Sequence, residues 1–278
     1  VYTVPSIPGD TASSGLRLIF TRETTMKSIF VPGLLALVFL TNFQSIHASE
    51  AVEAKLKDAM ASDIRSEAET DRDRNRKPAE TLAFFGLEDD MKVVELLPGG
   101  GWYTKLLAPV MAENGDYYVA LGTGRVKERI LGEPGFDKVK VVAEDANIYR
   151  PEGSRFYTLE LSDLEVTDAD MVLTFRNYHN FGAEGRAAMN KAAFDALKPG
   201  GVYAVVDHTQ RHMEGDNDEN RRRMDPVQAI KEIQAAGFVL EDYSDLHYRP
   251  DDELRFEVGR ATVTGNTDRW TLKFRKPE

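Results

Sequence analysis

A run of three glycines behind a short apolar segment is the feature that most constrains how this chain can fold. Residues 93–97 read Val-Val-Glu-Leu-Leu and are followed by Pro98 and by the glycines of 99–101. A short apolar run suits a strand that is covered on both faces of a parallel sheet. Adjacent glycines let the backbone turn tightly and let a ligand approach without meeting a Cβ atom. A helix that enters at Tyr103 would offer unpaired N–H groups at its start.

This stretch therefore predicts a strand, a glycine turn and a helix that together frame a crevice for a nucleotide-type cofactor. The alternative interpretation is a tight turn without a ligand, although a mere turn does not need the backbone entropy that three glycines cost. The spacing differs from G-x-G-x-x-G, which disfavours a dinucleotide.

Composition narrows the class of protein. The chain has 278 residues, of which 42% are hydrophobic and 29% charged, enough for one full-sized α/β domain with a real core. The net charge of −11 and the lack of a visible basic face argue against nucleic acid as a partner. The sequence contains no cysteine, which excludes disulfides, thiol catalysis and thiolate metal ligands.

The first fifty residues resemble a targeting segment. Met26 is followed by a lysine, by the apolar run 29–40 and by a small-residue site that ends at Ala48. One basic residue, a short apolar core and a small residue at the end are typical of a secretory signal peptide. The run is too short for a stable membrane span. A retained N-terminal anchor helix is the alternative.

The expected organisation follows from this segment. Residues 1–25 would be an upstream extension, and 26–48 the signal peptide. Residues 49–278 would form a single domain with a helical extension over 49–90. The mature protein would be exported, either periplasmic or secreted.

Strands and helices alternate through the middle of the chain, which indicates a parallel sheet covered on both faces. The third strand lies either at 139–142 or at 156–161. The last two strands have no helix between them and suit an antiparallel closing pair with 269–274 at the edge. The other expected strands are 93–97, 117–121, 170–175, 202–206 and the one that begins at 238–240, and the helices are 103–112, 182–197 and 225–236.

Polar side chains follow two of these strands. Asn177, Tyr178 and His179 come after 170–175, and Asp207 and His208 come after 202–206. Because the carboxyl ends of parallel strands meet at one edge, these side chains are expected near the glycine crevice. A histidine side chain commonly serves as a proton acceptor near neutral pH, so His179 suits a general base. The alternative is a structural histidine that is hydrogen-bonded to Asp207.

The segment from Thr209 to Met224 is polar and is a candidate lid or substrate loop. Its arginines at 221–223 suit an anionic acceptor, with a solvated basic turn as the alternative. His212 could join His179, Asp207 and His208 around a metal ion, but the spacing is not diagnostic and we expect no metal site.

The motifs carry a resemblance to a known family. Glu95-x-Leu97-x-Gly99-x-Gly101 resembles the first motif of class I S-adenosylmethionine-dependent methyltransferases, acidic-x-Gly-x-Gly-x-Gly, and Leu-Lys-Pro-Gly-Gly at 197–201 resembles their segment before the fifth strand. A group of exported bacterial methyltransferase-like proteins is more similar still. The resemblance to that group extends from Asp71 to Pro277 and is carried by the runs 76–80, 98–104, 174–180, 207–208, 267–270 and 273–277.

The resemblance implies an α/β fold with a Rossmann-like seven-stranded sheet, mostly parallel, with an antiparallel last strand and helices on both faces. It implies S-adenosyl-L-methionine as cofactor and a small-molecule acceptor of unknown identity. The implied cofactor contacts are Glu95, Leu97, Gly99, Gly100, Gly101, Tyr103 and Leu121. The implied acceptor-side residues are His179, Asn177, Tyr178, Asp207 and His208.

Two departures keep a second class of function open. Leu97 stands where the family has its first glycine, and Leu121 and Gly122 stand where many members have an acid that binds the ribose. They favour an exported binding or accessory protein without turnover on the same fold. A metal-assisted hydrolase built on Asp207, His208 and His179 is the third option.

Overall fold

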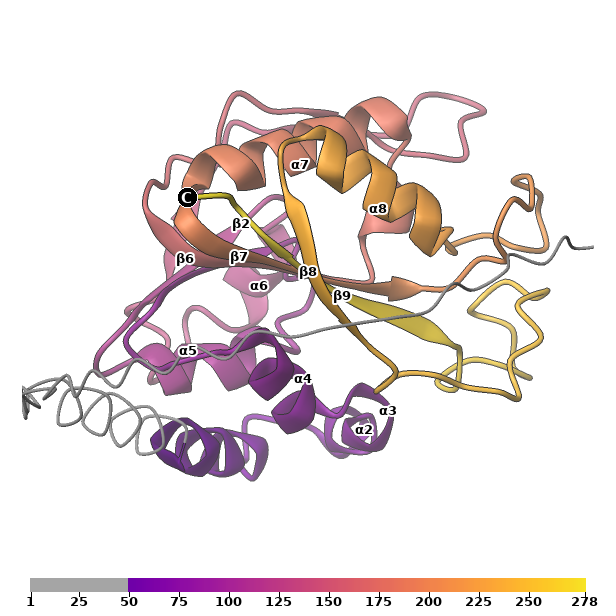
Figure 1. Cartoon of the computed structure of the whole chain (residues 1–278). Coiled ribbons are helices and arrows are strands. Elements are labelled where there is room, and N and C mark those ends of the chain that lie inside the picture. The colour runs from indigo at the N-terminus through magenta and orange to yellow at the C-terminus, as the bar shows by residue number, and fades with distance from the viewer. Residues whose placement is uncertain (1–49) are drawn as a thin grey trace, which may run out of the picture. The chain divides into compact units, whose positions relative to one another are not determined.

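A seven-stranded sheet lies at the centre of the computed structural model, which describes residues 50–278 (Figure 1). Its strands are β1 (Lys92–Leu96), β2 (Asp116–Ala120), β3 (Lys140–Val142), β6 (Ala169–Phe175), β7 (Leu197–His208), β8 (Val239–Ser244) and β9 (Arg269–Arg275). Their order is β3-β2-β1-β6-β7-β9-β8, and β9 runs antiparallel to both of its neighbours. The predicted fold class, a mostly parallel sheet with an antiparallel last strand, is confirmed.

Helices cover both faces of this sheet. Residues 50–60 are helical and precede α2 (Glu67–Thr70), α3 (Asp73–Arg76), α4 (Pro78–Phe85), α5 (Thr104–Met111), α6 (Gly124–Arg129), the 3-10 turn η1 (Tyr178–Asn180), α7 (Ala183–Ala196) and α8 (Pro226–Ala235). In Figure 1, α7 and α8 lie on one face, and α4 and α5 lie on the other. Neighbouring residues of β1 point to opposite faces, so that Val94 belongs to the core under α7 and Val93 to the core under α5.

The sheet resolves the ambiguity over the third strand. Segment 140–142 is β3 and pairs with β2, whereas 158–160 is β5 (Thr158–Glu160) and forms a separate two-stranded sheet with β4 (Asn147–Tyr149). The expectation that 269–274 is an edge strand is wrong. β9 pairs on both sides and buries Trp270, Thr271 and Leu272, which leaves β8 at the edge.

The N-terminal helical pattern is broken into short pieces. After residue 60 the Arg65 side chain donates to the Met60 carbonyl and pairs with Asp73, and Ser66 begins a new helix as its N-cap. Lys77 adopts a left-handed conformation before Pro78 begins α4. These turns bring Arg76 beside the glycine turn, where its guanidinium packs on Trp102, while Asp71 and Arg74 stay exposed.

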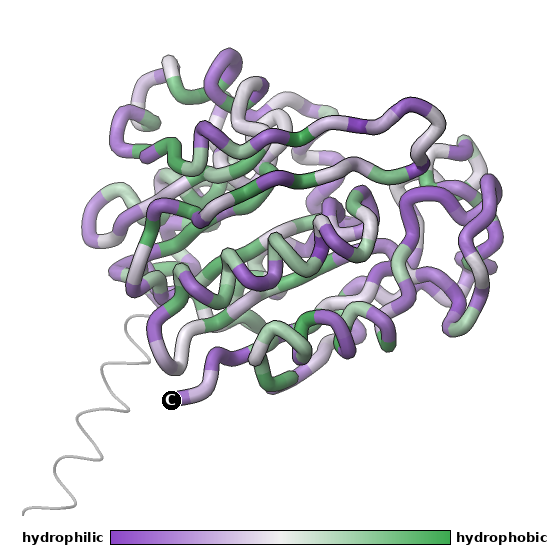
Figure 2. Tube along the Cα trace, turned by 90° about the horizontal axis from the view of Figure 1, so that it is seen from above, coloured by the Kyte–Doolittle hydropathy of each residue, from purple (hydrophilic) through white to green (hydrophobic). Residues whose placement is uncertain are grey.

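Two irregular segments, 209–225 and 245–268, lie beyond the carboxyl end of β7. They meet through Arg223, whose guanidinium pairs with Asp252 at 2.9 Å. Figure 1 shows them at the right, in orange and yellow, and Figure 2 shows that this end is mostly hydrophilic while the central strands are hydrophobic. The predicted upstream extension and signal peptide, 1–25 and 26–48, lie outside the described residues. No helix within residues 50–278 is long and apolar enough to cross a membrane.

Candidate active site

The glycine turn after β1 keeps a left-handed backbone even where the sequence has leucine. Leu97 has φ 56°, Gly99 61° and Gly101 84°. A left-handed conformation is unusual for a leucine and routine for glycine. Hydrogen bonds hold it here, because the Leu97 amide donates to the Ala120 carbonyl and its own carbonyl accepts from the Asn177 side chain at 3.1 Å.

A cavity of about 350 Å³ opens over this turn, within the range of small-ligand sites. We call it the glycine crevice. A Cβ atom at Gly100 would meet nothing within 4 Å, so this residue leaves the crevice open. The lining consists of Glu69, Arg76, Glu95, Leu97, Pro98, Gly99, Gly100, Trp102, Tyr103, Arg125, Arg129, Phe175, Arg176 and Asn177.

Two predicted cofactor contacts do not line the crevice. A Cβ atom at Gly101 would come within 2.8 Å of the Ile130 side chain, so Gly101 is needed for packing against the segment after α6. Leu121 is buried at the end of β2, with φ 65°, in the core under α7.

Glu95 is the buried acid of the crevice. Its Oε2 accepts hydrogen bonds from the Thr104 hydroxyl at 2.6 Å and the Tyr117 hydroxyl at 2.5 Å. Burial raises the pKa of Glu95 to about 7, against the lowering effect of these two hydrogen bonds. This carboxyl group therefore changes its protonation near neutral pH.

Aromatic rings and an arginine form one wall of the crevice. The Tyr103 ring stacks on Phe175 with centroids 3.5 Å apart and packs edge-on against Trp102 at 4.6 Å. The Arg76 guanidinium lies 4.1 Å from the centroid of a Trp102 ring, a cation–π contact. Each ring of this wall therefore packs against another ring or against the Arg76 guanidinium.

Asp207 holds His179, which follows β6, and His208, the last residue of β7. Its carboxylate accepts from the backbone amides of His179 (2.9 Å) and His208 (2.6 Å), and its Oδ1 lies 2.5 Å from His179 Nδ1. A carboxylate can only accept, so Nδ1 carries the hydrogen and Nε2 of the neutral ring is left as an acceptor. Within residues 50–278, Nε2 forms no hydrogen bond. The buried Asp207 carboxylate therefore fixes the orientation of the His179 ring and leaves Nε2 as a free hydrogen-bond acceptor.

The His208 ring has a different hydrogen-bond partner from the His179 ring. Its Nδ1 lies 2.8 Å from the Thr267 hydroxyl. Burial, with a smaller effect of the Arg269 charge, lowers the pKa of His208 well below its usual range. His208 is thus neutral near physiological pH.

The structure brings Asn177, His179, Asp207 and His208 to one edge of the sheet, as predicted. Tyr178 points the other way, into the core, where its hydroxyl donates to Glu232 at 3.1 Å and accepts from the Asn190 side chain at 2.8 Å. Its ring takes no part in the lining of the cavities at this edge.

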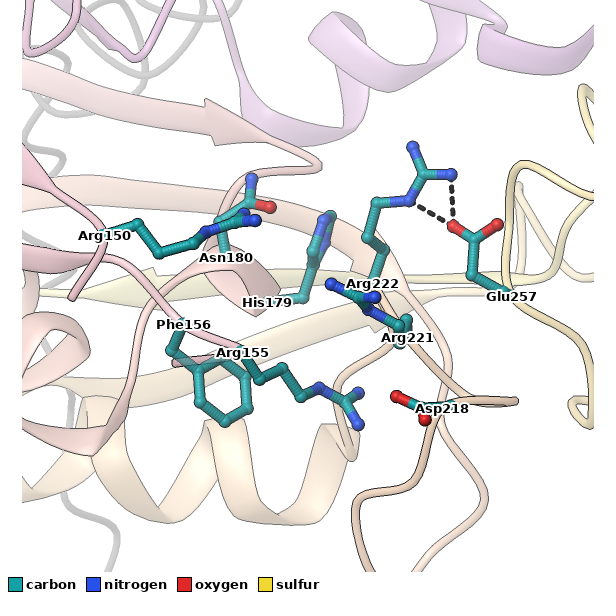
Figure 3. Close-up of a pocket in the computed structure, with 9 residues that line it drawn as sticks. All are labelled: Arg150, Arg155, Phe156, His179, Asn180, Asp218, Arg221, Arg222 and Glu257. Carbon is teal, nitrogen blue, oxygen red and sulfur yellow. Dashed lines mark hydrogen bonds and ion pairs between the residues drawn. The ribbon is translucent and has the colours of Figure 1, made fainter. Parts of the chain in front are cut away.

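Two further cavities continue from the glycine crevice. The middle cavity, about 300 Å³, shares Arg176 with the crevice and is also lined by Arg72, His179 and His208. The outer cavity, about 500 Å³, shares His179 and Arg222 with the middle one. Figure 3 shows His179 in the outer cavity, with arginines from several segments around it.

Most of these arginines could not be identified from the sequence pattern. Arg72 and Arg76 belong to a mixed-sign run that usually lies in solvent, and only the breaks between the short helices turn them inward. Two of them could have been found by their place in the sequence, because Arg76 and Arg176 lie within the runs 76–80 and 174–180 that carry the family resemblance.

Of the residues weighed for a metal site, His212 lies apart from the other three. His212 contacts Asp225 at 2.8 Å instead of joining His208. Among residues 50–278 no group of three or more His, Cys, Asp or Glu side chains is arranged to hold a metal ion.

Comparisons with known proteins agree with this fold. No protein-family model matches the chain, and no curated protein is significantly similar in sequence. A SAM-dependent methyltransferase from Aquifex aeolicus has a similar structure, with a TM-score of 0.51 and 15% identity over 80% of this chain and 97% of that one. The [4+2]-cyclase SpnF is also similar, with a TM-score of 0.50 and 15% identity over 73% of this chain and 80% of that one. Since proteins named for different reactions share this architecture, the likeness shows the fold alone.

Proposed function

We propose that this protein is an S-adenosylmethionine-dependent methyltransferase with a small-molecule acceptor. The observation that carries the proposal is the glycine crevice at the carboxyl end of β1, joined through Arg176 to a cavity that an aspartate-oriented histidine lines. The structural likeness to a SAM-dependent methyltransferase is consistent with it.

The donor set of the crevice fits this cofactor. Glu95 suits the ammonium of the methionine moiety, Arg76 suits its carboxylate, and Gly99 and Gly100 leave room for close approach. The cofactor, when bound, supplies an electrophilic methyl group.

The chain's own residues would orient the acceptor and move its proton. His179 Nε2 would take the proton from the acceptor hydroxyl or amine, and Asp207 would stabilise the imidazolium that forms. Asn177 would hold the glycine turn to the end of β6 through its bonds to the Leu97 and Phe175 carbonyls, both 3.1 Å. Such alignment is the main contribution of the protein to an in-line displacement.

Calorimetric titration of S-adenosylmethionine into the full chain tests the proposal. We expect micromolar binding that Gly100→Leu weakens by about tenfold or more, because the new side chain enters the crevice without straining the backbone. Gly132→Leu is the matched control, since a Cβ atom there also meets nothing within 4 Å and Gly132 is outside the crevice lining. No binding at millimolar cofactor would refute the proposal.

A second candidate, a binding or accessory protein without turnover, is favoured by the leucines at positions 97 and 121. Two results together would support this candidate over the enzyme. His179→Gln would leave cofactor binding intact, and the wild-type protein would transfer no methyl group to any acceptor from a screen of small molecules.

We also propose that the protein is exported and belongs with the exported methyltransferase-like group. The support is the signal-like segment 26–48 and the motifs quoted above. N-terminal sequencing of the protein from an exported fraction should give a start near Ser49. A mature N-terminus near Val1 would contradict export by this signal.

A further inference from the structure

Four arginines from distant parts of the chain form a group of positive charge between the glycine crevice and the middle cavity. We call Arg72, Arg76, Arg176 and Arg269 the arginine cluster. Each has a buried Nε atom without a hydrogen-bond partner, and none forms an ion pair with any residue of 50–278. Within residues 50–278, Arg269 alone of the four donates a hydrogen bond from its guanidinium, to the Asn75 carbonyl at 2.8 Å.

The absence of carboxylate partners within residues 50–278 distinguishes the arginine cluster from the other buried arginines. Elsewhere in the described chain buried arginines have carboxylate partners, as in Arg65 with Asp73 at 2.5 Å and Arg186 with Glu232 at 2.6 Å. Arg76 and Arg269 are only 8% and 4% exposed. Fully buried arginines are rare unless they are paired.

Burial and mutual repulsion make the cluster costly in the free protein. Burial, with the charge of Arg176, lowers the pKa of Arg76 to about 8 and that of Arg269 to about 9. Unpaired buried charges of this kind persist where a ligand supplies the opposite charge.

The middle cavity gives such a ligand access to the cluster. Arg72 and Arg176 line it together with Arg222, and no Asp or Glu of the described chain lines it. His208 and the Thr267 hydroxyl add polar groups. Arg222 is paired with Glu257, whereas Arg72 and Arg176 have no acidic partner within residues 50–278. Arginine forks match the oxygens of phosphate and carboxylate groups.

We propose that the middle cavity binds a doubly charged anionic group, a phosphate or a dicarboxylate, through Arg72 and Arg176. The role of this group as part of the methyl acceptor rests on the proposed function. Anion binding itself does not.

The outer cavity suits the remainder of such a ligand. Phe156 offers a ring face there, and Arg155 and Arg222 are already held, by Asn220 and Glu257 respectively (Figure 3). A ligand anchored in the middle cavity and extending outward would pass His179, which lines both. The anionic group would thereby position the acceptor beside the base.

Titration of simple anions into the full chain, without cofactor, tests the proposal. We expect inorganic phosphate or succinate to bind in calorimetry at low chloride, and acetate to bind at least tenfold more weakly, because a single charge leaves the cluster uncompensated. Phosphate preferred over succinate would identify a phosphate group, and the reverse a dicarboxylate. Binding of neither dianion would overturn the proposal.

Arg72→Gln should weaken binding of the preferred dianion by about tenfold or more, the loss of one charge-assisted hydrogen bond. Arg275→Gln is the matched control, because it also removes one positive charge but lies at the opposite end of the sheet, beside Val202. Arg176→Gln is a second cluster variant, and thermal unfolding shows that each variant is folded. Equal loss in Arg72→Gln and Arg275→Gln would show a general charge effect and contradict the site.

A crossed comparison separates this inference from the proposed function. Gly100→Leu should weaken S-adenosylmethionine binding and leave phosphate or succinate binding within about twofold, and Arg72→Gln should do the reverse. Loss of dianion binding in both variants would place the anion in the glycine crevice and overturn the assignment to the middle cavity.

Discussion

The carboxyl group of Glu95 links the stability of the protein to pH. An acid whose pKa is raised by folding holds its proton in the folded state while the unfolded state has lost it, so stability falls as pH rises between the two values. For Glu95 these are 4.5 and about 7. The full difference corresponds to roughly 3 kcal/mol.

Glu95→Gln should remove this pH dependence. The glutamine keeps an acceptor for Thr104 and Tyr117 without a charge to desolvate. We therefore expect the variant to gain stability over the wild type as pH rises from about 5 to about 8 in urea unfolding experiments. A constant difference across that range would show that Glu95 stays ionised in the folded protein.

Single arginines of the cluster should oppose folding. Arg176→Met replaces a partly buried charge that has no acidic partner in the described chain with an apolar side chain, so we expect the free energy of unfolding to rise by about 1 kcal/mol. Arg186→Met is the contrast, because it leaves Glu232 without its pair and should cost about 3 kcal/mol. Urea unfolding measures both. A loss of stability in Arg176→Met would mean that its charge is already compensated.

The irregular segments around the cavities depend on one buried ion pair. Arg223 and Asp252 are both fully buried, and the Asp252 carboxylate also accepts from the backbone amides of Leu254 and Asp268. Asp252→Asn leaves the Arg223 charge uncompensated and should cost about 3–5 kcal/mol.

Glu253, the exposed neighbour of Asp252, provides the control for segment 245–268. Glu253 lies 3.8 Å from Arg255 at the surface, so Glu253→Gln should change stability by less than about 0.5 kcal/mol in the same unfolding measurement. Because segments 209–225 and 245–268 frame the middle cavity, Asp252→Asn should also weaken phosphate binding. Wild-type stability in Asp252→Asn would show that the segments are held by other contacts.

Elements with strong local signals were predictable. Pro78 and Gly86 bound α4, and Asp225 caps α8 by accepting from the Val227 amide. Proline in the first turn, glycine after the last turn and aspartate at the N-cap are local signals that a sequence shows directly. The position of the last strand in the sheet was not predictable. The alternation of apolar and polar residues along 269–274 indicates which side chains are buried, but it does not indicate how many strands pair with β9.

The candidate site was predictable only in part, because tertiary contacts decide where some of its residues lie. Residues that follow strands, such as His179 and Asp207, converge because parallel strands end at one edge. The arginine cluster depends on breaks near residues 61–66 and at Lys77 that set where short helices point. Those breaks follow from tertiary contacts, such as Arg65 with Asp73, that no local pattern contains.

At the scale of the whole described domain, a single sheet separates two cores. Its strands contribute to both, since alternate residues of β1, β6 and β7 face α7 on one side and α5 on the other. Neither core can lose its packing while the strands between them keep theirs, so the domain should unfold in one cooperative transition.

The two tryptophans of the sequence test this, because they lie on opposite faces of the sheet. Trp270 is part of the core under α7 and Trp102 packs against the core under α5. In Trp102→Phe and Trp270→Phe, the remaining tryptophan reports one face, and its fluorescence transition in urea should coincide with the loss of far-ultraviolet circular dichroism. Phosphate should shift both curves of each variant together, because a ligand of the folded state stabilises the whole cooperative unit. A fluorescence change that precedes the loss of secondary structure in one variant alone would mean that the face with its tryptophan unfolds independently.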